Sequence, residues 1–347
     1  MNFTSKIVNW YTENKRSLPW RSTKEPYSVW LSEIILQQTK IKQGLPYYIK
    51  FKSSYPTIFD LAKANEQEIL KLWEGLGYYS RARNLHKTAI FIVENYNGIF
   101  PSNSLELINL PGIGKYTASA IASICFDEKT AVVDGNVFRV LSRYFGISTP
   151  INSSTGIREF AELAKKLLPN TRFGDYNQAL MDFGSLVCKP KLALCSSCIL
   201  NKTCWSNQND KIYSLPIKLN KLKVKNKYLN FLIINFEGNK TLIQQRNDKG
   251  KWANMYQFPL LETSNNIKKK EIVESKIFDQ YLEKDLSNLS LINNDQIIHK
   301  LSHQKLFINF WEVKPKIYDS NFISVQKLNR YPFPIVLNRF INSYFCQ

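Results

Sequence analysis

Apolar residues recur every three or four positions through the first two hundred residues of the chain. The pattern is clearest over 28–38, 66–77, 84–98 and 156–169, and glycine or proline follows closely behind several of these segments. Such spacing places the apolar side chains on one side of a helix, which Gly or Pro then ends. Residues 1–205 are therefore predicted to form an all-α domain.

The apolar period changes from three or four to two after residue 227. Residues 228–246 are predicted to form two strands that turn at 237–239, and Leu306, Ile308 and Phe310 share one face of a later strand. Period-two alternation of this kind is typical of half-buried strands.

The middle of this region, residues 265–285, carries an apolar stripe typical of a helix. We therefore predict a second, α+β domain over 228–347. The polar and lysine-rich segment 206–227 is predicted to link the two domains.

Charge and composition indicate the class of partner. The 347 residues include 47 Lys and Arg against 28 Asp and Glu, a formal net charge of +19. An excess of this size favours a polyanion, above all nucleic acid, through counterion release. The sequence shows neither a signal peptide nor a membrane-spanning run, so we expect a cytoplasmic monomer with no membrane contact.

Four of the six cysteines crowd into residues 188–204, with the spacing C-x6-C-x2-C-x5-C. Thiolates this close together suit one compact metal centre, because soft sulfur ligands favour zinc or an iron–sulfur cluster. The spacing alone leaves zinc and iron–sulfur equally open. The predicted ligands are Cys188, Cys195, Cys198 and Cys204.

The stretch "LPGIGKYTA", residues 110–118, is predicted to reverse the chain between two helices. Gly112 and Gly114 allow backbone angles closed to other residues, and the N–H groups at the start of the second helix favour an anion such as phosphate. By itself the motif fits any turn between two helices.

Two carboxyl groups lie in contrasting environments. Asp134 is predicted at the start of a helix, where N–H groups favour its ionised form. Helical spacing instead surrounds Glu33 with mostly apolar neighbours, which disfavour its anion; these are Val29, Trp30, Leu36 and Gln37. Such a pair supplies one acid and one anion. Simple helix capping by Asp134 and a buried ion pair of Glu33 explain the same residues equally well.

Several motifs in order resemble the MutY-type adenine DNA glycosylases, helix–hairpin–helix enzymes that are related to endonuclease III. They span residues 8–205 and include "LPWR", "PYSVWLSEIILQQT", "LWEGLGYYSRARNLHK", "LPGIGKYTA", "VDGNVFRV" and "NQALMDFG". The resemblance implies a [4Fe–4S] cluster on the four cysteines. It also implies that Glu33 is the acid and base, that Asp134 is the catalytic aspartate, and that Tyr116 and Asn136 help to position them.

Tyr116 bears on the type of reaction. In the endonuclease III-type enzymes a nucleophilic lysine stands two residues after the last glycine of the hairpin, where this chain has Tyr116. Lys115 is one position away, about 100° around the helix. The resemblance therefore implies a monofunctional enzyme that uses water to remove adenine mispaired with 8-oxoguanine or guanine. A tyrosine there is also explained by packing.

The resemblance also implies contacts with duplex DNA and a flipped-out base. Tyr78 is expected to intercalate and Gln38 to enter the base stack, whereas Tyr79 is expected in the core. The expected contacts with the DNA backbone are made by Arg81, Arg83, Gly112, Gly114 and Lys115.

Residues 228–347 resemble the Nudix-like domain with which MutY-type proteins recognise 8-oxoguanine. The stretch "HKLSHQKLFINFW" places Ser302 and His303 at the lesion-reading positions, with Leu301 where phenylalanine is common. Nucleotide hydrolysis is not expected, because the segment 268–285 lacks the Arg-Glu-x-x-Glu-Glu arrangement that binds Mg²⁺ in Nudix enzymes. A catalytically silent iron–sulfur DNA-binding protein and a pyrimidine glycosylase with lyase activity are the alternatives.

Overall fold

The computed structural model describes residues 2–219, 224–236, 238–247, 250–275, 287, 289–313 and 322–345. The chain forms two compact units. The first contains residues 1–63 and 84–220, and the second contains residues 64–83 and 221–347.

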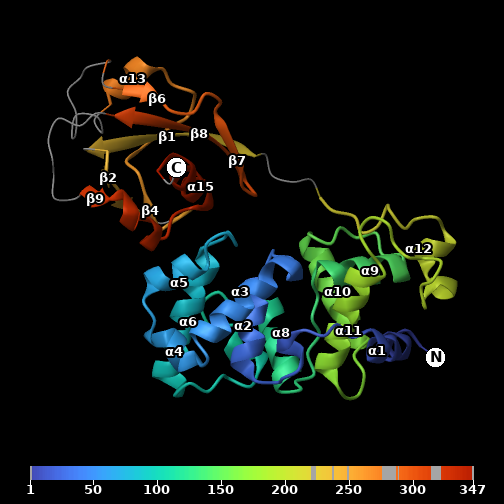
Figure 1. The fold of residues 1–347 in the computed structure, drawn as a ribbon. Helices are drawn as coiled ribbons and strands as arrows, with labels where there is room; N and C mark the ends of the chain where they lie inside the picture. Colours follow the sequence, from blue (N-terminus) through green and yellow to red (C-terminus); the bar gives the residue numbers. More distant parts are fainter. Residues whose placement is uncertain are drawn as a thin grey trace. The chain divides into compact units, whose positions relative to one another are not determined.

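The described part of the first unit is helical, as predicted (Figure 1). Short 3-10 turns η1 (Pro19–Arg21) and η2 (Asn201–Thr203) accompany its α-helices. The α-helices are α1 (Phe3–Asn14), α2 (Pro26–Leu36), α3 (Ile41–Ser54), α4 (Ile58–Lys63), α7 (Ser104–Leu107), α8 (Lys115–Cys125), α9 (Gly135–Phe145), α10 (Ser154–Lys166), α11 (Phe173–Leu186) and α12 (Trp205–Gln208). Helix α6 (Ser80–Tyr96) begins in the second unit and continues into the first.

Helix α11 is the centre of the first unit. It contacts α1, α8 and α9, and its residues from Phe173 to Gly184 are almost all buried. A Cβ atom at Gly184 would lie 2.7 Å from Cβ of Asn136, and one at Gly174 would lie 2.5 Å from the Ser123 carbonyl oxygen. Glycine at these two positions therefore lets α11 approach α8 and the start of α9.

Much of the predicted linker 206–227 is attached to the first unit. Leu215 is buried, its carbonyl oxygen accepts from Arg143, and the Ile151 N–H donates to the Ile217 carbonyl at 3.0 Å. The following strand already begins at Lys225. Sequence analysis missed these contacts because most of the segment is polar and rich in lysine. Only a few of its residues face the helices.

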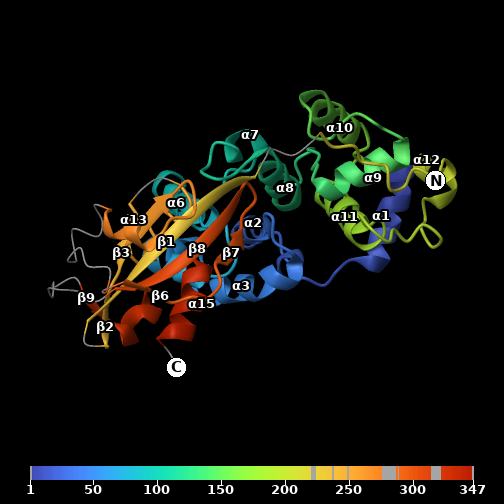
Figure 2. The same cartoon turned by 90° about the horizontal axis from the view of Figure 1, so that it is seen from above.

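The described part of the second unit contains a mixed seven-stranded sheet, a two-stranded sheet and short helices (Figure 2). The large sheet has the order β6-β8-β1-β2-β9, with β5 paired to β1 and β7 paired to β8. Its strands are β1 (Lys225–Phe236), β2 (Lys240–Leu242), β5 (Leu260–Thr263), β6 (Leu289–Leu291), β7 (Ile297–Lys300), β8 (Gln304–Val313) and β9 (Phe322–Ser324). The smaller sheet and the helical elements are β3 (Gln244–Gln245), β4 (Tyr256–Gln257), α5 (Glu66–Leu72), α13 (Lys269–Val273), η4 (Val325–Arg330) and α15 (Ile335–Tyr344).

The parallel pair β1 and β8 forms the centre of the large sheet, and both of its faces are covered. On one face Phe310 of β8 stacks on Phe340 of α15, with ring centroids 3.7 Å apart. On the other face Leu232 and Trp311 belong to an apolar cluster that includes Ile272 of α13. This arrangement confirms the predicted α+β class. The predicted helix over 265–285 is the short α13 in its described part, and residues 276–285 lie outside the described residues.

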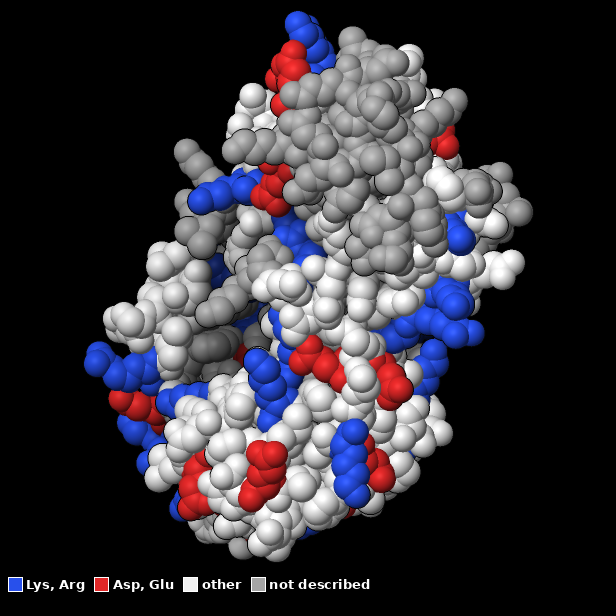
Figure 3. All heavy atoms as spheres, turned by 90° about the vertical axis from the view of Figure 1, so that its left-hand side faces the viewer, with Lys and Arg blue, Asp and Glu red and all other residues white. Residues whose placement is uncertain are grey.

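Within the described residues, no helix combines the length and apolar character needed to span a membrane. On the face drawn in Figure 3, basic side chains occur at several places with acidic side chains among them. The net positive charge alone therefore does not mark one binding path on this face.

Candidate active site

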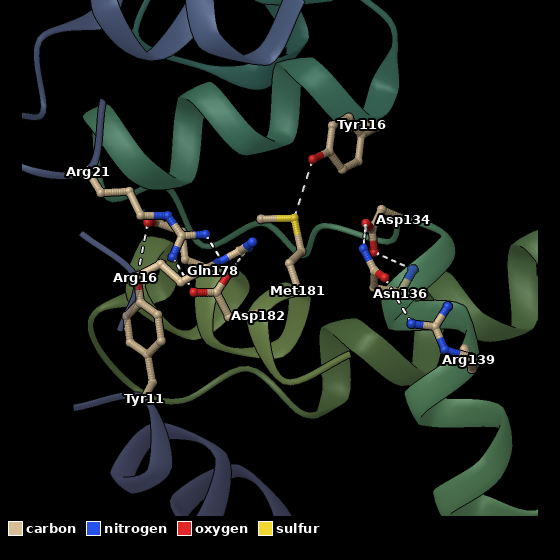
Figure 4. Close-up of polar contacts among 10 residues, drawn as sticks. All are labelled: Tyr11, Arg16, Arg21, Tyr116, Asp134, Asn136, Arg139, Gln178, Met181 and Asp182. Carbon is tan, nitrogen blue, oxygen red and sulfur yellow. Dashed lines mark hydrogen bonds and ion pairs between the residues drawn. The ribbon is translucent and has the colours of Figure 1, made fainter. Parts of the chain in front are cut away.

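One cavity of the first unit brings together the four predicted catalytic residues, Glu33, Tyr116, Asp134 and Asn136. Its volume is about 600 Å³, which is within the usual range for small-molecule sites. Helix α2 supplies Glu33, α8 supplies Tyr116, and the start of α9 supplies the other two. Figure 4 shows the polar contacts around this cavity.

Glu33 has the properties of an acid near neutrality. Val29 and Leu36, one turn away on α2, line the same cavity wall. Burial raises the pKa of Glu33 to about 7, whereas a hydrogen bond with Tyr116 and the charge of Arg21 act to lower it. The predicted direction of this pKa shift is confirmed, and its cause is the loss of hydration of the anion.

Asp134 is the N-cap of α9, as predicted. Its Oδ1 accepts from the backbone N–H groups of Asn136 and Val137, both at 2.8 Å, and its Oδ2 accepts from Asn136 Nδ2 at 2.6 Å. Burial raises the pKa of Asp134 although these hydrogen bonds act to lower it. The helix-start N–H groups act on the carboxyl in the predicted direction, and the loss of hydration on burial opposes them.

Tyr116 and Lys115 point in different directions at the start of α8. Tyr116 lines the cavity, and its hydroxyl lies 3.3 Å from Met181 Sδ. Burial and the nearby charge of Glu33 raise the pKa of Tyr116 well above its usual value. Lys115 is exposed and is not among the residues that line the cavity. The difference of one position therefore removes the amine from the cavity, as predicted.

The sequence did not predict an ion cluster that lies beside the cavity. Asp182 of α11 is fully buried and pairs with Arg16 and Arg21. Burial alone would raise the pKa of Asp182, but its hydrogen bonds with the two arginines outweigh burial and lower it. Gln178, also missed, lines the cavity and accepts from the Tyr11 hydroxyl at 3.1 Å. The sequence did contain a sign of this cluster: Asp182 stands in the segment "NQALMDFG", whose other residues face the protein interior.

Asn136 connects Asp134 to the cysteine segment through Arg139. Arg139 Nη2 donates to Asn136 Oδ1 at 2.9 Å, and Arg139 Nε donates to the Cys188 carbonyl at 2.7 Å. Figure 4 shows the first part of this chain of contacts. Arg139 of α9 therefore connects the residues around Asp134, the N-cap of the same helix, to the cysteine segment.

The four predicted metal ligands line a single cavity with mostly apolar walls; they are Cys188, Cys195, Cys198 and Cys204. None of these four cysteines forms a disulfide in the described part of the chain. Arg143 Nη1 lies 3.5 Å from Cys188 Sγ, and the Leu200 N–H donates to Cys198 Sγ at 3.4 Å. No group of three or more His, Cys, Asp or Glu in the described residues is arranged to hold a single metal ion.

The predicted hairpin lies between α7 and α8, and its two glycines differ. Gly112 has a φ of +74°, and a Cβ atom there would lie 2.6 Å from Cβ of Asn84. Gly114 has an ordinary φ of −93°, and a Cβ atom there would meet nothing within 4 Å. Only Gly112 therefore needs the special backbone angle that we expected of both, and Gly114 leaves open space beside the start of α8.

In the second unit, Tyr78 occupies a strained loop between α5 and α6. Tyr78 is 51% exposed and has a φ of +49°. Tyr79 is buried, as predicted. Arg81, the second residue of α6, is also buried and donates to the Leu76 and Gly77 carbonyls of the loop, whereas a phosphate contact requires an exposed position. Arg83 donates to the Ala253 carbonyl at 2.8 Å. Gln38 is exposed in the turn that follows α2 in the first unit, and it lines the cavity there.

The predicted lesion-reading residues form the tip of the hairpin that joins β7 and β8. Ser302 and His303 are exposed, and the Leu301 N–H donates to the Gln304 carbonyl at 2.8 Å to close the turn. The hydroxyl groups of Tyr78 and Ser302 are in contact. Both lie in a cavity of about 700 Å³ that Trp252 and His299 also line.

Comparison with known proteins finds a matching family for each of the two parts of the chain. Residues 31–166 match the HhH-GPD superfamily base excision DNA repair proteins, and residues 230–343 match the NUDIX domain. The adenine DNA glycosylase of Buchnera aphidicola subsp. Baizongia pistaciae is 38% identical over 320 residues, which cover 91% of this chain and 87% of that protein. The mouse adenine DNA glycosylase is 43% identical over 59% of this chain and 42% of its own length.

Solved structures resemble the helical part. A thermostable thymine-DNA glycosylase is 34% identical with a TM-score of 0.56 and covers 60% of this chain and 95% of its own. An endonuclease III–DNA complex, 22% identical with a TM-score of 0.53 over 60% of this chain and 94% of its own, shows the fold alone. The fold, the cavity and the near full-length match agree: the chain belongs to the MutY-type adenine DNA glycosylases.

Proposed function

We propose that this enzyme removes adenine mispaired with 8-oxoguanine or guanine in duplex DNA, by hydrolysis and without lyase activity. One observation carries the proposal: a cavity large enough for a base contains Glu33, whose pKa is about 7, together with Asp134. The adenine DNA glycosylases that match most of the chain support adenine as the base.

The chemistry divides between the two carboxyl groups. Protonated Glu33 gives its proton to a ring nitrogen of adenine, and the bond between sugar and base then breaks with its electron pair going to the base. The sugar left behind has oxocarbenium character, and the Asp134 carboxylate stabilises its positive charge. Water then attacks the sugar carbon and gives a proton to the Glu33 carboxylate, which restores the acid.

Asn136 and Tyr116 position these two groups. Asn136 holds Asp134 through one side-chain and one backbone hydrogen bond. Tyr116 hydrogen-bonds Glu33 and occupies the wall from which a lysine amine could otherwise attack. With Lys115 outside the cavity, no Schiff base with a lysine amine forms there, and water supplies the hydroxyl group that the sugar carbon gains.

DNA binding requires the adenine to leave the base stack and enter the cavity. Tyr78 and Gln38 fill the gap, and the hairpin with Gly112, Gly114 and Lys115 holds the DNA backbone. Support comes from the exposure of Tyr78 and from the open space beside Gly114. Ser302 and His303 then contact 8-oxoguanine on the opposite strand. This role is supported by their exposed position at the tip of a hairpin.

We also propose that the four cysteines hold a [4Fe–4S] cluster. Their common cavity with apolar walls, with Arg143 and the Leu200 N–H directed at two sulfur atoms, supports one metal centre held by these four sulfur atoms. The match to the MutY-type adenine DNA glycosylases favours the iron–sulfur cluster over zinc. Such a cluster would supply structural cross-linking of residues 188–204. Iron and zinc analysis of the purified protein, with Cys198→Ser as control, distinguishes the two metals.

A single-turnover assay tests the function. A duplex with one adenine opposite 8-oxoguanine is incubated with enzyme in excess, and strand breaks are measured with and without alkali. The proposal predicts breaks only after alkali, and none with Glu33→Gln. Breaks without alkali indicate lyase activity. No breaks under either condition, from metal-loaded protein that binds the duplex, indicate the silent DNA-binding protein.

A second duplex with thymine opposite guanine tests the choice of base. The thymine/uracil-DNA glycosylase of Methanothermobacter thermautotrophicus is 35% identical over 58% of this chain and 91% of its own length, so the helical part alone does not determine the base. Faster removal of thymine than adenine would contradict the proposed substrate.

A further inference from the structure

The loop that carries Tyr78 has an unusual backbone. Gly75, Gly77 and Tyr78 have φ angles of +95°, +73° and +49°, so three residues of four adopt left-handed conformations. A tyrosine pays a steric penalty at positive φ that glycine does not. Nothing lies within 4 Å of a Cβ atom built on Gly77, so packing alone does not impose this conformation there. Other contacts must hold the loop in place.

Those contacts converge on one carbonyl group. The Gly77 carbonyl oxygen accepts from Trp73 Nε1 at 3.0 Å and from Arg81 Nη2 at 3.2 Å. Arg81 Nη2 also lies 3.4 Å from the Leu76 carbonyl oxygen. The residue immediately before Tyr78 is therefore held from two sides, by an indole and by a guanidinium.

The guanidinium of Arg81 also contacts aromatic rings. Its central carbon lies 5.0 Å from the ring centroid of Trp73 and 5.7 Å from that of Tyr78. Trp73 is fully buried and Arg81 is only 7% exposed, so the group works in a medium of low polarity where these attractions are strong.

The position of Arg81 is otherwise unfavourable for a cation. It is the second residue of α6, and the positive end of the helix dipole repels a positive charge there. Burial also opposes the charge and lowers the pKa of Arg81 to about 10, so it remains charged at neutral pH. A lysine could not replace it, because only the planar guanidinium can both reach backbone carbonyls and lie over rings.

We propose that Arg81 is a positioning residue that fixes the left-handed loop and so presents the Tyr78 ring to DNA. This inference rests on the proposed role of Tyr78 as the intercalating residue. It replaces the phosphate contact that the basic sequence "SRAR" suggested. Arg81 then contributes to base removal only through Tyr78.

A double-mutant cycle tests this role, because residues that act through one another do not give additive effects. The variants are Tyr78→Ala, Arg81→Met and both together, with Lys87→Met as the control for loss of an exposed positive charge on the same helix. The readouts are single-turnover removal of adenine opposite 8-oxoguanine and the salt dependence of binding to a duplex with a non-cleavable adenine analogue.

We expect Tyr78→Ala to weaken binding roughly tenfold, as loss of one stacking platform does. Arg81→Met should weaken binding to the duplex by about the same factor. The double variant should bind no more weakly than Tyr78→Ala. The slope of binding affinity against salt concentration should be the same for Arg81→Met as for the natural protein. Arg81→Lys, which keeps the charge, should behave like Arg81→Met and serves in its place if Arg81→Met does not fold.

Two results would overturn the inference. Additive losses, with a salt slope reduced by about one in Arg81→Met, would show a direct phosphate contact. No loss in Tyr78→Ala would remove the intercalating role of Tyr78, and the inference with it. Adenine removal by Tyr78→Ala at the wild-type rate would leave the proposed glycosylase function intact, so the two failures can be told apart.

Discussion

Asn136 holds Asp134 at both carboxylate oxygens. The Asn136 backbone N–H donates to Oδ1 at 2.8 Å and its side-chain Nδ2 donates to Oδ2 at 2.6 Å. The two residues are thereby locked in one orientation at the start of α9, and the amide oxygen of Asn136 accepts from Arg139. The aspartate that we assign to the sugar cation is therefore oriented before DNA binds.

Replacing Asn136 by alanine should slow adenine removal without unfolding the protein. Asp134 keeps its two backbone donors but loses one charge-assisted hydrogen bond, worth about 1.5–3 kcal/mol. A loss of this size in the transition state corresponds to a roughly 10- to 100-fold lower single-turnover rate. The control is Asn95→Ala, on an exposed part of α6. Equal rates for the two variants would show that Asn136 does not position Asp134.

The rate of adenine removal should fall as the pH rises above about 7. Glu33 acts as an acid only in its protonated form, and burial raises its pKa to about 7. A pH–rate profile under single-turnover conditions measures this limb. A rate that stays constant from pH 6 to pH 9 would contradict the assignment of Glu33 as the acid.

Glu33→Gln, which we expect to be inactive, should be more stable than the natural protein at high pH. The pKa of Glu33 rises from 4.5 in the unfolded chain to about 7 in the folded one, so the folded state binds the extra proton. The contribution of protonated Glu33 to the free energy of unfolding is therefore complete below pH 4.5 and is lost as the pH rises through about 7. Glutamine avoids the buried anion, for a gain on the order of 1–3 kcal/mol. Thermal unfolding should show the gain at pH 8 and little difference at pH 4.

Short-range patterns predicted much of the fold and of the site. The three-to-four spacing predicted the helices and also placed Glu33 beside Val29 and Leu36, because these residues are one helical turn apart. The same rule separated Tyr116 from Lys115 on α8. Such inferences succeed where the neighbours that matter lie within a few residues in the sequence.

Features that depend on distant contacts were missed. Asp182 meets Arg16 and Arg21 across more than 160 residues, and its burial comes from the position of α11 between other helices. The pKa of Asp134 is raised by burial, whereas the sequence showed only its helix cap. Arg81 at the start of α6 resembles an exposed cation in the sequence, because its aromatic neighbours become visible only in the folded loop.

The two glycines of the hairpin should respond differently to alanine. Gly112→Ala places a Cβ atom at positive φ and 2.6 Å from Asn84 Cβ, so it should cost at least about 1–2 kcal/mol and lower the melting temperature. Gly114→Ala meets ordinary backbone angles and open space, so its stability should change little. Its methyl group should still weaken duplex binding, because it blocks close approach of a phosphate. Stability loss in Gly114→Ala, or unchanged binding, would contradict this division.

Replacing Asp182 by asparagine should be strongly destabilising, because it leaves two arginines facing a buried neutral group. Breaking such a buried pair typically costs about 3–5 kcal/mol. Asp175→Asn on the same helix removes an exposed pair with Arg172 and should cost less than about 1 kcal/mol. Denaturant unfolding of both variants at neutral pH measures the difference.

The pH dependence of the Asp182 variant has a defined sign. The arginines lower the pKa of Asp182 in the folded state, so its stabilising contribution is complete above its unfolded pKa of 3.8 and declines as the pH falls through the lower folded value. The gap in stability between the natural protein and Asp182→Asn should therefore be constant from pH 5 to pH 8 and should narrow below pH 3.8. A gap that narrows already between pH 5 and pH 7 would show that another group, and not the Asp182 carboxylate, holds Arg16 and Arg21 beside the cavity.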